Sequence, residues 1–213
     1  MPRPFETRMQ EKRRHRKRQG VSLFCGLLLF AACFLIYFLS ETEWVQKEYL
    51  YPYPYRATVE RYARSYGVDS SLAAGVILAE SRFQENAHSH RGAVGLMQLM
   101  PETGAWIAAQ LDDSFSTAHL AEPAVNIRYG IWYLGELEKE FSGNDILALA
   151  AYNAGRGNVR EWMERYGWTR DFSDVRAIPY AETREYVAHV LKYQKKYAAL
   201  YTSAAPVLSA ARR

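Results

Sequence analysis

Cysteine is scarce in this sequence: there are two in 213 residues, and both lie near the N-terminus, at Cys25 and Cys33. No cysteine follows them, so the remainder of the chain can form no internal disulfide bond. Its folded part must therefore be stabilised by an ordinary apolar core. A chain of about 150 residues can supply one, because it buries roughly 70% of its unfolded surface.

Excess basic charge is absent from most of the chain, although the whole carries a formal charge of +4. Residues 1–20 hold eight of the 27 Lys and Arg residues and two of the 23 Asp and Glu residues, which leaves 19 basic against 21 acidic residues. A balance of −2 after residue 20 does not suit a polyanion-binding domain, because phosphate backbones are bound by clustered cations. We therefore expect no nucleic-acid partner.

Residues 21–39 contain no charged side chain at all. As an α-helix this segment would be about 28 Å long, close to the ~30 Å hydrocarbon core of a bilayer. Twelve of its residues are Val, Leu, Ile or Phe. Together they favour insertion by about 4 to 7 kcal/mol. A transmembrane helix is thus favoured over the alternative, a buried core helix.

The basic flank predicts the direction of this span. Because Lys and Arg are retained on the cytoplasmic side, residues 1–20 predict a cytoplasmic N-terminus, a single pass through the cell membrane and an extracytoplasmic domain after Leu39. A cleaved signal peptide is disfavoured, because no small-residue cleavage site follows Leu39. A lipoprotein site at Cys33 is disfavoured as well, since the apolar run continues beyond that residue.

The chain after the span divides into three parts by composition. Residues 40–55 combine aromatic side chains with Pro52 and Pro54, which disfavour helix, and we expect an interfacial aromatic belt and a short, stiff stalk. Residues 56–201 contain the helical patterns of a single domain. Residues 202–213 are small and polar, which predicts a disordered tail.

No alternating strand pattern competes with the helical one, so the expected fold class is all-α. Asp69 or Ser70 is expected to cap a helix that begins near Leu72. A short extended piece is expected around residues 92–100, where two glycines occur. Helices are expected at about 59–66, 72–83, 101–111, 123–141, 145–154, 158–166 and 180–201.

One carboxylic acid stands in apolar surroundings. Glu80 ends the run 73–79, which is otherwise apolar, near the C-terminus of its expected helix. Apolar surroundings and the negative end of the helix dipole both raise the pKa of a carboxyl group. An acid that is neutral near pH 7 can protonate the leaving oxygen of a glycosidic bond. From position alone, a boundary glutamate that faces water is the simpler interpretation.

Four motifs that follow one another along the chain change that interpretation. They are Glu80-Ser81 with Ser89, Gly92-Ala93 and 95–101 (GLMQLMP); 126–130 (NIRYG) with 132–134 (WYL); 151–155 (AYNAG); and 178–180 (IPY) with 182–184 (ETR) and Tyr186-Val187. Together, across about residues 56–200, they resemble the soluble lytic transglycosylase family, a lysozyme-like group.

The resemblance implies a lysozyme-like helical domain behind one N-terminal transmembrane helix. It also implies an enzyme that needs no cofactor and cleaves the β-1,4 bond between MurNAc and GlcNAc in peptidoglycan, leaving 1,6-anhydro-muramyl ends. Glycan strands and, through residues 21–39, the cytoplasmic membrane are then the expected partners. The sequence itself points to no protein partner.

The resemblance also assigns residues to the site. Glu80 matches the single catalytic acid/base. The substrate-binding residues that it implies are Ser89, Met97, Gln98, Met100, Tyr152, Asn153 and Tyr186. Their chemistry suits a glycan, because hydroxyl groups can orient the acid or an acetamido group and methionines can form apolar walls for sugar faces. For Met100 and Tyr152, an ordinary place in the core is the alternative.

A second carboxylate beside Glu80 is missing from the pattern, although most glycosidases use two. Glu182 is the nearest candidate, but Arg184 and Lys192 follow it and favour a structural ion pair. In the family's reaction the substrate's own acetamido group and C6 hydroxyl replace the second acid and the water. A muramidase hydrolase and a non-catalytic glycan-binding scaffold are the alternatives.

The loop after Glu80 departs from the family's pattern. Gln84-Glu85 stands where Asn-Pro is common, and His90 stands where Pro is common, so this loop is expected to differ in shape. His88 and His90 lack a third ligand at a suitable spacing. They are therefore interpreted as solvated loop histidines, and no metal site is expected.

Overall fold

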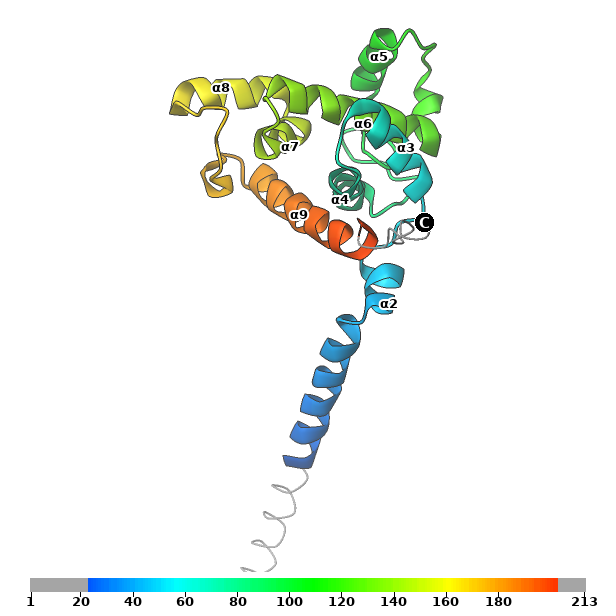
Figure 1. Cartoon of the computed structure of the whole chain (residues 1–213), viewed down its shortest axis with the longest axis vertical. Helices are drawn as coiled ribbons and strands as arrows, with labels where there is room; N and C mark the ends of the chain where they lie inside the picture. Colours follow the sequence, from blue (N-terminus) through cyan, green and yellow to red (C-terminus); the bar gives the residue numbers. More distant parts are fainter. Residues whose placement is uncertain (1–22, 203–213) are drawn as a thin grey trace, which may run out of the picture. The chain divides into compact units, whose positions relative to one another are not determined.

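The computed structural model describes residues 23–202 of the chain, which divides into two compact units, Met1–Leu50 and Tyr51–Arg213 (Figure 1). The predicted basic segment, 1–20, lies outside the described residues. So does the predicted tail, 202–213, apart from its first residue.

The first unit contains one long apolar helix, Leu23–Ser40, with a mean hydropathy of 2.5. By length and composition it is able to cross a membrane, and none of it is buried, unlike the core helix of a soluble domain. Two short helical elements follow it, α2 (Glu43–Val45) and the π-helical η1 (Gln46–Leu50). After a break at Glu41 and Thr42, helical structure therefore runs on to Leu50 and stops before Tyr51, because the residue preceding a proline, here Pro52, is biased away from the helical conformation.

The second unit is all-α, as predicted, with seven α-helices among its described residues. All the helices predicted from spacing are present, with ends that differ by a few residues. They are α3 (Arg56–Tyr66), α4 (Ser70–Ser81), α5 (Pro101–Gln110), α6 (Pro123–Glu140), α7 (Asp145–Ala154), α8 (Arg156–Tyr166) and α9 (Ala181–Tyr197). Three short helices, η2 (Thr117–Ala121), η3 (Val175–Ala177) and η4 (Ala198–Thr202), accompany them. The expected extended piece consists of two isolated β-bridges, His88 with Val94 and Val94 with Leu99.

Helix α4 is the centre of the unit and packs against α9 (Figure 1). Its side chains are buried nearly all round, and full burial of residues such as Ile77 stabilises the fold by about 1.5–3 kcal/mol each. Asp69 caps the helix, since its side chain accepts a hydrogen bond from the Ser71 N–H. Gly75 lets α9 approach closely: a Cβ there would lie 3.1 Å from the Val190 carbonyl oxygen.

The loop between α4 and α5 is fastened to α6 by a buried amide. The Asn126 side chain accepts a hydrogen bond from the Met97 N–H at 2.7 Å and donates to the carbonyls of Val94, at 2.9 Å, and Leu120, at 2.8 Å. Met97 then packs directly on Gly130, where a Cβ would lie 2.3 Å from the Met97 sulfur. This loop therefore has a fixed position beside the end of α4.

Residues 51–55, which the sequence analysis places in a stalk, pack on the domain. The Tyr197 hydroxyl donates to the Pro52 carbonyl at 2.8 Å, and the Tyr53 hydroxyl donates to the Ser70 carbonyl at 3.2 Å. The Tyr53 ring also lies 5.2 Å from the Tyr197 ring. The compact unit accordingly begins at Tyr51 rather than at Arg56, because these aromatic side chains find partners on α9.

Candidate active site

Glu80 lies in the last turn of α4 and is partly exposed at the surface. Burial of its carboxyl group raises the pKa from 4.5 to about 7, and the nearby Tyr186 hydroxyl opposes this shift. The direction of this pKa shift agrees with the expectation from the apolar residues that precede Glu80 in the sequence. A carboxylic acid with this pKa is about half protonated at neutral pH, while its partly open position leaves it accessible to a ligand.

The Tyr186 hydroxyl approaches Glu80 from α9. Burial and the Glu80 charge both raise the pKa of Tyr186 well above its usual value. This hydroxyl interacts with the Glu80 carboxyl and lowers its pKa, and it is the one buried side-chain polar group without a geometrically defined hydrogen-bond partner among residues 23–202. It therefore retains a donor that can orient the acid or bind a ligand group.

Tyr152 approaches Glu80 from α7. Its hydroxyl donates to the Met97 carbonyl at 2.9 Å, and burial together with the Glu80 charge raises its pKa well above the usual value. Its ring lies 5.5 Å from that of Tyr133. Three helices, α4, α7 and α9, thus bring one acid and two tyrosine hydroxyls together in poorly solvated surroundings.

The Gln98 and Met97 side chains stabilise the loop between α4 and α5 and do not extend from it into solvent. The Gln98 side chain donates to the Ala87 carbonyl at 3.1 Å and to the Gly95 carbonyl at 2.8 Å, with a backbone φ of 47°. The Met97 side chain is fully buried, so this residue offers the site its backbone carbonyl. Ser81 also ties the loop to α4, since its hydroxyl donates to the Leu96 carbonyl at 2.8 Å.

Ser89 and Met100 lie at the surface of the same loop. The Ser89 hydroxyl accepts a hydrogen bond from the Ala93 N–H at 2.9 Å, and no hydrogen bond joins Ser89 to Glu80. Met100 is 36% exposed at the start of α5, which disfavours the alternative that it is a core residue.

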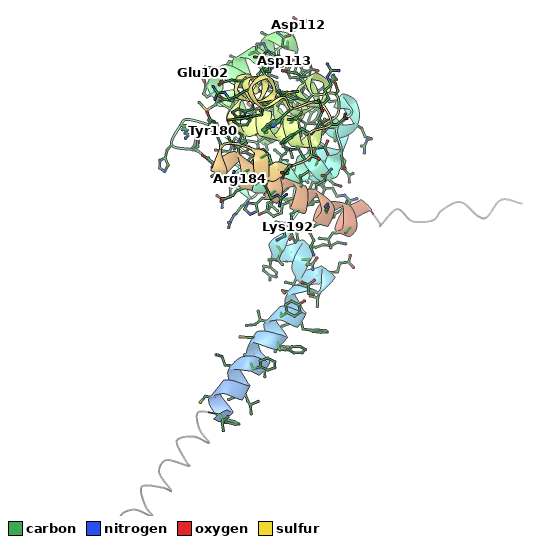
Figure 2. The ribbon with its side chains drawn as sticks, turned by 90° about the vertical axis from the view of Figure 1, so that its left-hand side faces the viewer. Glu102, Asp112, Asp113, Tyr180, Arg184 and Lys192 are labelled. Carbon is green, nitrogen blue, oxygen red and sulfur yellow. The ribbon has the colours of Figure 1, made fainter. Side chains whose placement is uncertain are left out.

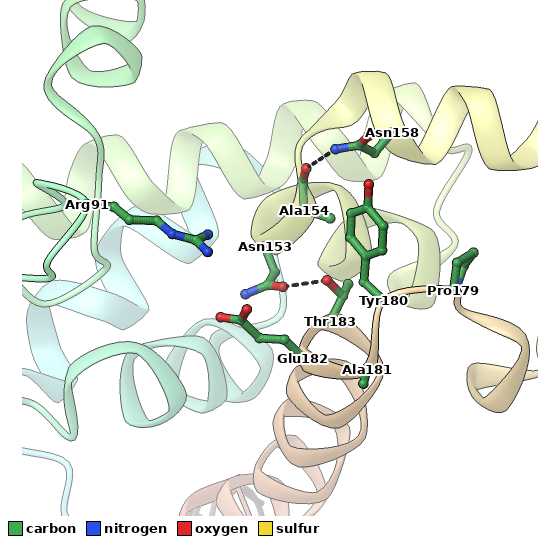
Figure 3. Close-up of a pocket in the computed structure, with 9 residues that line it drawn as sticks. All are labelled: Arg91, Asn153, Ala154, Asn158, Pro179, Tyr180, Ala181, Glu182 and Thr183. Carbon is green, nitrogen blue, oxygen red and sulfur yellow. Dashed lines mark hydrogen bonds between the residues drawn. The ribbon is translucent and has the colours of Figure 1, made fainter.

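Asn153 lies on the wall of an open pocket of about 520 Å³ between the end of α7 and the start of α9 (Figure 3). Its side-chain oxygen accepts a hydrogen bond from the Thr183 hydroxyl at 2.8 Å. The pocket is lined by Arg91, Asn153, Ala154, Asn158, Pro179, Tyr180, Ala181, Glu182 and Thr183. The sequence analysis predicts only Asn153 of this set as a binding residue.

Glu182 does not form the ion pair that the sequence analysis expects. Arg184 instead donates to the Ile178 carbonyl at 2.9 Å, and no salt bridge links Glu182 to it or to Lys192 in the described part of the chain. Figure 2 shows Arg184 and Lys192 at separate places along α9. The expectation was wrong because residues two apart face different sides of a helix, while Lys192 lies about 15 Å further along the axis.

An aromatic series that the sequence analysis did not assign extends from Tyr152. The ring centroid of Tyr133 lies 6.0 Å from that of Trp106, and the ring centroid of Trp106 lies 5.5 Å from that of Trp132. Trp106 is 38% exposed, and the Arg156 guanidinium lies 5.6 Å from its ring. Tyr133 and Trp132 belong to a family motif, whereas nothing in the local pattern marks Trp106 as a site residue.

Among the described residues, no group of three or more His, Cys, Asp and Glu side chains is placed to hold a metal ion. His88 and His90 are both exposed on the loop between α4 and α5.

An all-α domain that holds a poorly solvated acid between tyrosine hydroxyls, beside an open polar pocket, has the features of a lysozyme-like domain. The family model described as Transglycosylase SLT domain matches residues 57–175, more than half of the chain. The chain therefore belongs to the transglycosylase SLT-domain family.

Relatives of known name agree with this assignment. The soluble lytic murein transglycosylase of Salmonella typhimurium is 36% identical over 157 residues, which are 72% of this chain and 24% of that protein. The membrane-bound lytic murein transglycosylase C of Haemophilus ducreyi is 30% identical, over 67% of this chain and 45% of that protein. The structure of an inactive Glu→Gln mutant of the lytic transglycosylase Slt from Pseudomonas aeruginosa matches with a TM-score of 0.64 and 38% identity, over 73% of this chain and 26% of that one. The chain thus spans less than half of the length of each of these relatives.

Proposed function

We propose that this protein is a peptidoglycan lytic transglycosylase that cleaves the β-1,4 bond between MurNAc and GlcNAc. The observation that carries the proposal is Glu80, whose pKa of about 7 suits a group that must donate a proton near neutral pH and then recover it. The names of the relatives support the same reaction.

In the proposed reaction Glu80 first protonates the glycosidic oxygen as the bond to the leaving sugar breaks. The substrate's acetamido group stabilises the positive charge that develops at the anomeric carbon. Glu80 then removes the proton from the C6 hydroxyl as that oxygen attacks the anomeric carbon, which closes a 1,6-anhydro ring. The internal attack is favoured by its high effective concentration.

The remaining site residues have supporting roles in this proposal. Tyr186 orients the Glu80 carboxyl or the acetamido group through its unpartnered hydroxyl, and Tyr152 stacks beside the substrate. Asn153 and Ser89 offer polar groups to the glycan, and Met100 an apolar wall. Gln98 and Met97 act mainly by fixing the loop that carries these groups.

A two-carboxylate muramidase is the alternative enzyme. Such an enzyme needs a second carboxyl group beside the scissile bond, whereas the transglycosylase route needs Glu80 alone. Mass spectrometry of digested sacculi distinguishes the possibilities: anhydro-muramyl products support the proposal and reducing ends support the hydrolase. Release of no glycan fragment would favour a non-catalytic glycan-binding scaffold.

We also propose that the apolar helix anchors the enzyme in the cytoplasmic membrane, with residues 1–20 in the cytoplasm and the catalytic domain outside. The proposal is supported by the uncharged sequence of residues 21–39, by the basic residues before it, and by the membrane-bound relative. Such an anchor would keep the enzyme close to the wall that it cuts.

A further inference from the structure

The outward face of α9 changes charge along its length. Its first turns carry Glu182 and Glu185, whereas its last turns carry Lys192, Lys195 and Lys196. Lys192 and Lys195 are exposed, and Lys196 is partly exposed. The sequence contains no Asp or Glu after Glu185. We call the three lysines the lysine patch, because they concentrate positive charge at one end of the helix.

The lysine patch is not neutralised by ion pairs. No salt bridge involves its lysines in the part of the chain that the structure describes. Lys195 lines an open surface pocket together with Asp145 and Asp171 and pairs with neither. The basic residues of the domain that do pair with acids are Arg56, Arg128, Lys139, Arg156, Arg160, Arg165 and Arg176. The patch therefore presents positive charge to an external anion.

The lysine patch lies where the chain enters the domain. The Lys196 Nζ lies 5.9 Å from the centroid of the Tyr51 ring, and Tyr51 is the first residue of the second unit. Only residues 41–50 separate it from Ser40, where the apolar helix ends. Such a segment spans at most roughly 35 Å when fully extended and about 15 Å when helical. The chain itself thus keeps the patch close to any membrane that the apolar helix crosses.

The catalytic acid lies at the other end of the same pair of helices. The Gln194 side chain donates to the Asp69 carboxylate, directly before α4, at 3.1 Å. Tyr186 approaches Glu80, in the last turn of α4. Helices α4 and α9 are therefore antiparallel, and the step from Tyr186 to Lys196 corresponds to about 15 Å along α9. A surface that binds the lysine patch leaves the Glu80 end of the pair facing away from it.

We propose that the lysine patch docks the catalytic domain on the membrane by binding the anionic phosphodiester headgroups of its lipids. The inference rests on the proposed membrane anchor and is independent of the proposed reaction. Each lysine near an anionic bilayer favours the bound state by roughly fivefold. This attraction acts within a Debye length of ~8 Å at physiological salt, so it needs a tether that keeps the domain close. Docked in this way, the domain turns the Glu80 end of α4 away from the lipid, toward the wall outside.

The test measures energy transfer in the full chain, inserted in nanodiscs that carry an acceptor dye on their lipid headgroups. Cys25 and Cys33 are replaced by serine, and Ala188→Cys, at an exposed position one turn before Lys192, carries the donor. We expect more transfer in nanodiscs that contain phosphatidylglycerol than in nanodiscs of phosphatidylcholine alone. The difference should vanish at ~1 M salt, where the Debye length is about 3 Å.

A lysine variant and two controls make the test specific. Lys192→Gln, Lys195→Gln and Lys196→Gln together should lower the ratio of docked to free domain about 100-fold and abolish the response to phosphatidylglycerol. The matched control removes three charges on α6 and α8, by Lys139→Gln, Arg160→Gln and Arg165→Gln, and should respond like the wild type. A donor at Ser114→Cys should respond less, because it is near Asp112, which Figure 2 shows at the opposite end of the domain from Lys192.

Three results would overturn the docking. They are equal transfer with and without phosphatidylglycerol, an unchanged response in the lysine variant, and loss of the response in the matched control. Lower stability of the lysine variant with an unchanged response would show that the lysines only stabilise the C-terminal end of α9 through its dipole. A chain that is not retained in phosphatidylcholine nanodiscs would contradict the anchor and the docking with it. Cleavage of glycan strands is measured separately and decides the proposed reaction alone.

Discussion

At the residue scale, the behaviour of Glu80 depends on a balance between burial and one hydroxyl. Burial raises the pKa of the carboxyl group, and the Tyr186 hydroxyl lowers it. The resulting value of about 7 puts the titration of the acid within the range of ordinary assays. The protonation state of Glu80 that the proposed reaction requires can therefore be tested with pH–rate profiles.

The first prediction concerns pH. Only the protonated form of Glu80 can donate, so kcat/KM on soluble glycan strands should be level in mild acid and fall as pH rises through about 7. Well above that value the fall should approach tenfold per pH unit. Rates measured from pH 5 to 9 give the profile. An activity that rises through neutrality would mean that the essential form of Glu80 is the carboxylate.

The second prediction concerns Tyr186. Tyr186→Phe removes the hydroxyl that lowers the Glu80 pKa, so the descending limb of the pH profile should move to higher pH. The exposed Tyr166 on α8 provides the control, because Tyr166→Phe should leave the limb in place. An unmoved limb in the Tyr186 variant would show that the hydroxyl does not act on the acid.

The sequence predicts some residues of the site better than others. The raised pKa of Glu80 could be predicted, because it follows from the apolar run directly before it. The position of Tyr186 beside Glu80 depends on how α9 packs against α4 at Gly75. No local sequence pattern predicts this packing, and Tyr186 was assigned to the site only through the family resemblance. The sequence analysis also expected an ion pair at Glu182 that does not form in the described part of the chain. Cations that are near Glu182 in sequence are not its neighbours on the helix surface.

At the scale of elements, the helices were predictable because the residues that start and end them lie at the helix boundaries in the sequence. Asp69 caps α4, while Pro101 and Pro123 stand in the first turns of α5 and α6. Residues 51–55 were not predictable in this way. Their prolines indicate only that helix stops, whereas their packing depends on tyrosines at the other end of the domain.

The third prediction follows from that packing. A soluble fragment that begins at Arg56 loses the hydrogen bonds that Tyr197, Tyr201 and Tyr53 make in the 51–55 region, along with the aromatic contacts. At about 0.5–1.5 kcal/mol for each bond, it should be roughly 2–4 kcal/mol less stable than a fragment that begins at Tyr51. Urea unfolding of the two fragments measures the difference. Equal midpoints and slopes would place the domain boundary at Arg56 after all.

At the scale of the whole molecule, the proposed topology separates a cytoplasmic basic segment from an extracytoplasmic enzyme. A reporter that is active only outside the cytoplasm, fused after Arg213, should be active. The same reporter on a chain in which the basic residues of 1–20 are replaced by glutamine should lose much of that activity, because the orienting charges are gone. A cytoplasmic reporter that is active after Arg213 in the native chain would reverse the orientation.

The most direct test of the whole account is the activity of Glu80→Gln on glycan strands. The amide keeps the size of the side chain but can neither donate nor recover the proton, so release of anhydro-muropeptides should fall at least ~10²–10⁴-fold. The protein should remain folded. Because its folded-state pKa is raised, ionised Glu80 destabilises the wild type as pH rises from 4.5 to about 7, so the variant should be at least as stable above that pH.

Glu85→Gln, Glu102→Gln and Glu182→Gln, made singly, are the matched controls, and none should abolish cleavage in a folded protein. Release of anhydro-muropeptides by Glu80→Gln at the wild-type rate would contradict the assignment of the acid and the mechanism with it. Complete and equal loss in folded Glu80→Gln and one of the control variants would instead support a two-carboxylate hydrolase.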